Sequence, residues 1–122
     1  MRTATEQGVR IQGPRVAMNA ALVANTFTLF QVSNFASQVG VKTYRIKRIL
    51  AVNYAGADTW LYIGTGLGLA LFAQVMPRIR LVNNFNAAVN EDDIPDVEFA
   101  ADITAFVDNA TCEVQLEIEE VG

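Results

Sequence analysis

The last third of the chain alternates between apolar and polar residues with a period of two, and no other feature constrains the fold as strongly. The alternation runs through residues 97–107 and again through residues 112–119, with the turn-forming residues 108–111 between them. Because successive side chains of a β-strand point to opposite faces, each run predicts a strand with one buried and one solvent-facing side. We therefore predict a closing β-hairpin that places Cys112 and the following side chains in the core: Ile103, Val107, Val114, Leu116 and Ile118.

Four earlier segments are rich in aromatic and β-branched residues and predict further strands: residues 26–32, 43–53, 59–63 and 73–82. The second segment changes phase near Arg48, as a strand does at a β-bulge. Residues 53–58 contain turn formers and predict a hairpin to the next strand. Pro77 has no N–H to donate, so the fourth segment is expected at a sheet edge or a bulge. Residues 83–96 predict a long loop.

Short strands without helical periodicity predict an all-β fold, and we expect an antiparallel β-sandwich that is jelly-roll-like. The strand pattern alone leaves a jelly-roll and an immunoglobulin-like topology both open. A chain of 122 residues fits one domain with its own core. Residues 21–122 are expected to form this sandwich domain. Residues 1–20 are expected to form an extended N-terminal arm, because Gly8, Gly13 and Pro14 interrupt any regular pattern.

The arm carries apolar and basic side chains that suit contact with an acidic neighbour. Its candidate partner-binding residues are Arg2, Arg10, Ile11 and Arg15. An isolated segment of this kind is normally disordered, and it gains order by lying across an adjacent subunit or adding to its sheet edge.

The chain contains no histidine and a single cysteine, which excludes most catalytic and metal chemistry. Without histidine there is no Ser-His or Cys-His pair and no common transition-metal ligand. We therefore expect no enzymatic activity, no metal site and no cofactor. The sequence predicts neither a signal peptide nor a membrane span, since the most apolar stretch, residues 67–76, is too short. We expect a protein made in the cytoplasm.

Charge is divided unevenly along the chain. Residues 1–48 hold seven basic residues and one acidic residue, a formal charge of +6, whereas residues 49–122 hold two basic and twelve acidic residues, a charge of −10. Such a division fits nucleic-acid binding by the basic half or contact between opposite halves of two copies. We favour contact between copies, because the basic half has no run of lysine and arginine. Asp92 and Asp93 are the candidate acidic contacts.

Two groups of aromatic and basic residues leave alternatives open. Trp60 and Tyr62 fall on one face of their strand, where they could stack on a sugar or pack in the core or at a subunit interface. Arg45, Lys47 and Arg48 beside Tyr44 could follow a phosphate backbone, although a solvated strand face explains them more simply.

The order of strand-like segments resembles a known group of proteins. The segments are "YRIKRILAVNYAGADTWLYIGTG", then "MPRIRLVNNFN", then the closing "CEVQLEIEEVG". Over about residues 43–122 the chain resembles the small β-sandwich virion proteins of tailed bacteriophages, the capsid decoration or cement proteins. The resemblance lies in strand order and carries no site residues.

This resemblance implies a non-enzymatic protein that binds the outer surface of an assembled capsid and bridges neighbouring subunits of the major capsid protein. It implies a dimer or trimer, located on the exterior of the virion, with no direct contact to nucleic acid or membrane. Two alternatives remain from the residues themselves: a carbohydrate-binding β-sandwich module, and a small β-barrel nucleic-acid binder.

Overall fold

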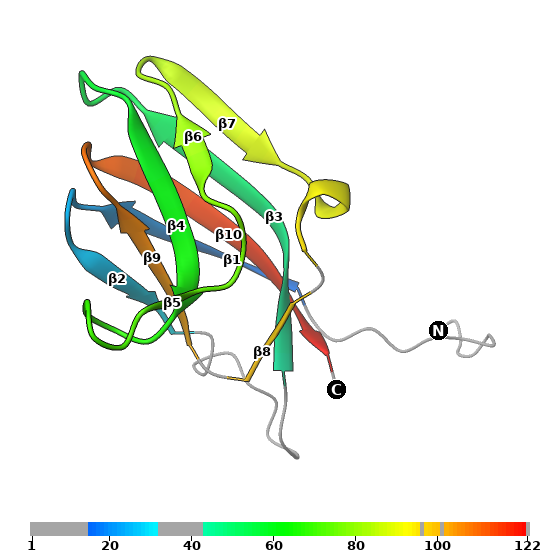
Figure 1. Cartoon of the computed structure of the whole chain (residues 1–122). Helices are drawn as coiled ribbons and strands as arrows, with labels where there is room; N and C mark the ends of the chain where they lie inside the picture. The colour runs from blue at the N-terminus through cyan, green and yellow to red at the C-terminus, as the bar shows by residue number, and fades with distance from the viewer. Residues whose placement is uncertain (1–14, 32–42, 96, 101, 122) are drawn as a thin grey trace.

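The computed structural model describes residues 15–31, 43–95, 97–100 and 102–121, and in these ranges almost all regular secondary structure is β-strand. The strands form two antiparallel sheets that pack against each other, which confirms the predicted all-β sandwich (Figure 1). The elements are β1 (Arg15–Leu22), β2 (Phe27–Phe30), β3 (Thr43–Asn53), β4 (Thr59–Thr65), β5 (Ala73–Gln74), β6 (Ile79–Leu81), β7 (Phe85–Val89), the 3-10 helix η2 (Glu91–Asp93), β8 (Glu98–Phe99), β9 (Ile103–Val107) and β10 (Cys112–Val121). No helix within these ranges is long and apolar enough to cross a membrane.

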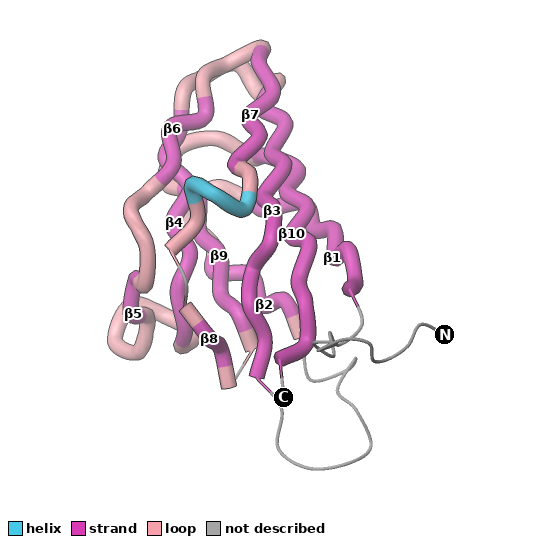
Figure 2. Tube along the Cα trace, turned by 90° about the vertical axis from the view of Figure 1, so that its right-hand side faces the viewer, coloured by secondary structure: helices cyan, strands magenta, loops and turns pink. Residues whose placement is uncertain are grey.

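The strand order is that of a jelly roll. Sheet A has the order β1-β10-β3-β7, and β8 pairs with the same edge of β3 as β7 does. Sheet B has the order β2-β9-β4-β5, and β6 shares the outer edge of β4 with β5. Each sheet thus has four strand positions, and consecutive strands mostly lie in opposite sheets, as in a double Greek key. The view in Figure 2 shows β3, β10 and β1 side by side in one layer.

The two predicted hairpins are wrong in their pairing. β3 belongs to sheet A and β4 to sheet B, so residues 54–58 cross between the sheets. The closing pair is likewise divided: β9 pairs with β2 and β4, whereas β10 pairs with β1 and β3. The period of two identifies a strand and its inward face, but it is the same whether the next strand lies beside it or opposite it.

The expected strand over residues 73–82 is divided into β5 and β6 on either side of Pro77, whose ring cannot take part in a ladder. The predicted loop over residues 83–96 is partly wrong, because it contains β7. Residues 97–107 form two strands in different sheets, β8 and β9. The predicted bulge is confirmed: Glu117 pairs with Arg48 and Ile118 with Ile46, which leaves Lys47 as the extra residue.

Part of the expected arm belongs to the sandwich. Residues 15–22 form β1, which pairs with β10 along its whole length from Arg15 opposite Glu119 to Leu22 opposite Cys112. The sheet therefore begins six residues before the expected start of the domain at residue 21. Residues 1–14, with Arg2, Arg10 and Ile11, lie outside the described residues, and so does the side chain of Arg15.

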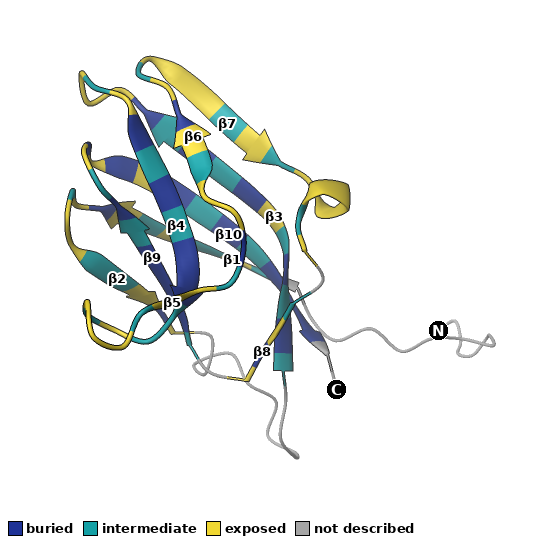
Figure 3. Ribbon diagram, in the orientation of Figure 1, coloured by how far each residue is buried: buried dark blue, intermediate teal, exposed yellow. Residues whose placement is uncertain are grey.

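The core lies between the two sheets (Figure 3). All five predicted core side chains of β9 and β10 are buried, and so is Cys112: Ile103, Val107, Val114, Leu116 and Ile118. Burial of the Cys112 thiol raises its pKa. Four connections gather at one end of the sandwich (Figure 1): β1–β2, β3–β4, β6–β7 and β9–β10. We call this end the crossover end; the turn between β4 and β5 lies at the opposite end.

Candidate functional site

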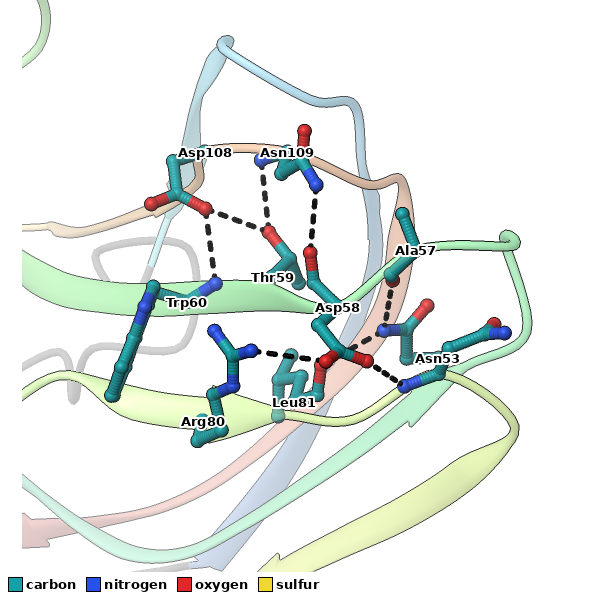
Figure 4. A network of polar contacts seen from close by, with 10 residues as sticks. Asn53, Ala57, Asp58, Thr59, Trp60, Arg80, Leu81, Asp108 and Asn109 are labelled. Carbon is teal, nitrogen blue, oxygen red and sulfur yellow. Dashed lines mark hydrogen bonds and ion pairs between the residues drawn. The ribbon is translucent and has the colours of Figure 1, made fainter.

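A network of hydrogen bonds holds the crossover end together (Figure 4). The hydroxyl of Thr59, at the start of β4, accepts from the backbone N–H groups of Asn109 at 2.9 Å and Ala110 at 3.2 Å. It also donates to Asp108 Oδ1 at 3.0 Å. One buried threonine therefore joins the β3–β4 connection to the β9–β10 connection.

Asn53 plays the same role at the end of β3. Its side chain is completely buried, and its Nδ2 donates to the carbonyl oxygens of Ala57 at 2.8 Å and Leu81 at 3.0 Å. Its Oδ1 accepts from the N–H of Ala55 at 3.2 Å. These polar groups satisfy the backbone of the crossovers rather than facing a ligand, so the network is structural.

Asp108 completes this network from the β9–β10 connection. Partial burial acts to raise its pKa, but hydrogen bonds from the Trp60 N–H and from the Thr59 and Tyr62 hydroxyls outweigh it and hold the pKa below its usual value. The carboxylate is therefore ionised and committed to three donors. This is the opposite of a general acid or base, whose pKa lies near neutrality.

Trp60 and Tyr62 lie on one face of β4, as predicted, and this face is the outer side of sheet B. Tyr62 continues a row of rings across the sheet: the centroids of Phe27 and Phe106 are 4.5 Å apart, and those of Phe106 and Tyr62 are 5.9 Å apart. Both residues are partly exposed. They are therefore surface residues rather than members of the core between the sheets.

Two arginines cover this aromatic surface. The guanidinium carbon of Arg78 lies 3.9 Å from the centre of the Trp60 ring, and that of Arg80 lies 5.0 Å from it. Arg78 also donates to the Tyr62 hydroxyl at 3.3 Å, and Arg80 pairs with Asp58 at 3.0 Å. Cation–π contacts of this kind occupy a ring face that a sugar would need for stacking. The arrangement does not favour the carbohydrate-binding alternative.

Two of the three basic residues of β3, Arg45 and Lys47, are paired with acids, whereas Arg48 is exposed. Arg45 binds Glu98 at 2.7 Å, and Lys47 lies 2.9 Å from Glu91 and 3.7 Å from Glu119. The Tyr44 ring is buried in the core and not beside the basic groups. Burial of its hydroxyl, with nearby Glu120 and Asp102, raises its pKa. This geometry does not place a stacking ring beside the basic groups, as the nucleic-acid alternative requires.

The glutamates of β10 differ from expectation at the end of the strand. The alternation predicts that they keep an outer face soluble, yet Glu119 and Glu120 are both buried. Lys47, the bulged residue of β3, turns its ammonium group toward Glu119. The bulge thus supplies a cation to a carboxylate that burial would otherwise destabilise.

Asp92 and Asp93 lie on η2, exposed at the surface. Neither forms an ion pair with another described residue. Among the described residues there is no group of three or more His, Cys, Asp or Glu side chains placed to hold a metal ion. The acidic segment therefore presents negative charge to the surroundings.

Sequence reasoning missed two surfaces that carry large apolar side chains. At the crossover end, four of them are exposed: Val23, Tyr54, Val82 and Phe85. At the opposite end, the β4–β5 turn exposes Leu67, Leu69 and Leu71. Gly66 and Gly68 have positive φ angles in this turn, a backbone conformation that glycine adopts more readily than other residues. The exposed leucines belong to the apolar run of residues 67–72, and this run was the signal available in the sequence.

A third surface is an open hollow of about 410 Å³ on the outer face of sheet A. Its lining comes from three adjacent strands: Asn19, Ala20 and Ala21 of β1, Leu50 and Val52 of β3, and Glu113, Val114 and Gln115 of β10. We call it the sheet A trough. The register places Ala21, Glu113 and Val52 in one row, and Asn19, Gln115 and Leu50 in the next.

The chain was compared with protein-family models, with curated proteins and with solved structures, and none of them matches it.

Proposed function

We propose that the chain is a non-enzymatic structural protein of a virion, which binds the outer surface of an assembled phage capsid and bridges neighbouring subunits of the major capsid protein. The supporting observation is the presence of exposed apolar side chains at both ends of the sandwich. A bridging protein needs two separate contact surfaces, and clustered apolar side chains mark such surfaces. The jelly roll is an architecture that viral capsid proteins share with lectins and cupins.

The distance between the two surfaces fits the proposed role. β4 runs from Thr59 at the crossover end to Thr65 at the leucine turn, seven residues in all. At about 3.3 Å per residue the two ends are roughly 20 Å apart. One end can therefore contact one capsid subunit while the other end contacts its neighbour.

The exterior of the capsid is the location we propose, because the acidic surface suits a position away from packaged DNA. Asp92, Asp93, Glu113 and Glu117 are all on the outer surfaces of sheet A and η2. Negative charge of this kind repels phosphate. We further propose that the chain acts as a dimer or trimer.

Capsid binding tests the proposal directly. Capsids assembled from the major capsid protein of the same genome are mixed with the purified chain, pelleted and then melted. The chain should co-sediment and raise the temperature at which the capsids break. A Leu69→Ser/Leu71→Ser variant should still fold but should lose the stabilising effect. The matched control is Ala88→Ser, at an exposed position on the outer face of β7. Absence of the wild-type chain from the capsid pellet would refute the proposal.

A further inference from the structure

We propose that the sheet A trough binds the N-terminal segment of a second copy of this chain, residues 1–14. The inference rests on the self-association within the proposed function and is independent of the capsid partner. It also gives the basic N-terminal segment and the uneven charge distribution a common explanation.

The trough has the shape and chemistry of a site for an extended peptide. The described side chains that β1 contributes to this face are Ala17, Asn19 and Ala21, which are small, so the surface is low beside the larger Leu50 and Val52 of β3. Glu113 is the charged residue of its lining. A volume of about 410 Å³ lies within the range of ligand sites, roughly 300–1,000 Å³.

The N-terminal segment has the matching chemistry. Val9 and Ile11 are two residues apart, so in an extended chain both point to the same side. Leu50 and Val52 have the same spacing on the face of the trough. Arg10 lies between Val9 and Ile11, and its long side chain can reach a carboxylate at the rim. We assign Glu113 as its partner.

Chain geometry favours a second copy over the same copy. β1 begins at Arg15 and runs toward the trough, which it reaches at residues 19–21. Pro14 restricts its own φ and favours an extended Gly13 before it. A chain that continues straight backward from Arg15 would carry Ile11 about 30 Å from Ala20, at roughly 3.3 Å per residue. Its own trough is then out of reach, whereas the trough of a neighbour is accessible.

A complementation experiment tests this arrangement with the chain alone. Leu50→Glu blocks the trough but keeps the segment, and a chain lacking residues 1–13 keeps the trough and every strand described above. Each variant alone should be a monomer by light scattering, and an equimolar mixture should form a one-to-one complex. The matched control is Leu29→Glu, a partly exposed leucine on the outer face of sheet B, which should assemble like the wild-type chain. Far-UV circular dichroism and thermal melting establish that each variant is folded.

Charge exchange locates the contact within the trough. A labelled peptide of residues 1–14 should bind the truncated chain, and Arg10→Glu in the peptide or Glu113→Arg in the protein should weaken binding by about fivefold or more. The two changes together should restore it. The free peptide should also dissociate the full-length oligomer.

Three results would overturn the inference: a mixture of the two variants that stays monomeric, a Leu50→Glu chain that still assembles, or peptide binding that Leu50→Glu leaves unchanged. None of them bears on capsid pelleting, so failure of this inference is distinguishable from failure of the proposed function. A monomer that still pelleted with capsids would refute the trough and leave the capsid role standing.

Discussion

Asn53 provides the sharpest test of how the crossover end is held together. Replacing it with alanine removes the bonds to Leu81, Ala57 and Ala55 at once. The Leu81 carbonyl is in a buried position, and an unsatisfied buried group costs about 1–3 kcal/mol. The other two bonds are only part-buried and water replaces them, so each adds about 0.5 kcal/mol. We predict that Asn53→Ala lowers the free energy of unfolding by about 2–4 kcal/mol.

A second substitution separates hydrogen bonding from packing. Asn53→Asp keeps the shape of the side chain but places a carboxylate oxygen against the carbonyls of Ala57 and Leu81, where Nδ2 now donates. Because a buried charge without a partner is strongly unfavourable, this variant should lose about 3–5 kcal/mol and be less stable than Asn53→Ala. A packing role alone would make aspartate the milder change.

Urea denaturation followed by the fluorescence of Trp60, the single tryptophan, measures both variants. The matched control is Asn86→Ala on the outer side of β7, where an exposed side chain should contribute less than about 0.5 kcal/mol. The reasoning is refuted if Asn53→Ala is no more destabilising than Asn86→Ala, or if Asn53→Asp is more stable than Asn53→Ala.

Three further predictions concern the core, the pH dependence of stability and the N-terminal segment. Leu116→Ala should cost about 2–5 kcal/mol and Gln115→Ala almost nothing in urea melts, and the reverse order would contradict the register of β10. Asp108 has a lowered pKa in the folded chain, so its stabilisation is full above its unfolded pKa of about 3.9 and is lost as the pH falls through the folded value. The stability difference between wild type and Asp108→Asn should therefore shrink below about pH 4, and a constant difference across melts at several pH values would contradict this. Removal of residues 1–13 should leave the melting temperature of the sandwich nearly unchanged, and a truncated chain that fails to fold would contradict the independence of the segment.

The sequence predicted which side chains of each strand face the core better than it predicted which strands pair with each other. Leu116 and Val107 are buried as expected, because a period of two reports directly on which side chains face the core. The bulge at Lys47 was likewise visible as a change of phase. Pairing is a different property, since it depends on which sheet the chain enters after a turn. Residues 108–111 have the composition of a hairpin turn, yet they connect β9 of one sheet to β10 of the other.

The structural features that the sequence failed to predict lie where no regular pattern of apolar residues marks them. β7 lies at the edge of sheet A, and its exposed Phe85, Asn86 and Ala88 do not alternate like a half-buried strand. The role of Asn53 was also invisible, because an asparagine before a glycine-containing segment reads as a turn residue whether or not it is buried. The trough and the apolar surface of the crossover end depend on side chains from several separate segments of the chain. No single stretch of sequence carries their pattern.

The crossovers that made pairing hard to predict also explain how the chain can expose apolar side chains at one end and remain folded. Four connections meet at the crossover end, and their backbone groups must find partners there. Asn53, Thr59 and Asp108 supply several of these partners from within, whereas the side chains of Tyr54 and Phe85 form none of the hydrogen bonds described here. A partner that docks on these exposed side chains therefore displaces water and breaks none of the internal hydrogen bonds. Loss of the buried polar residues should then impair folding first, whereas loss of the exposed apolar residues should impair association alone. This separation suits the proposed bridging role.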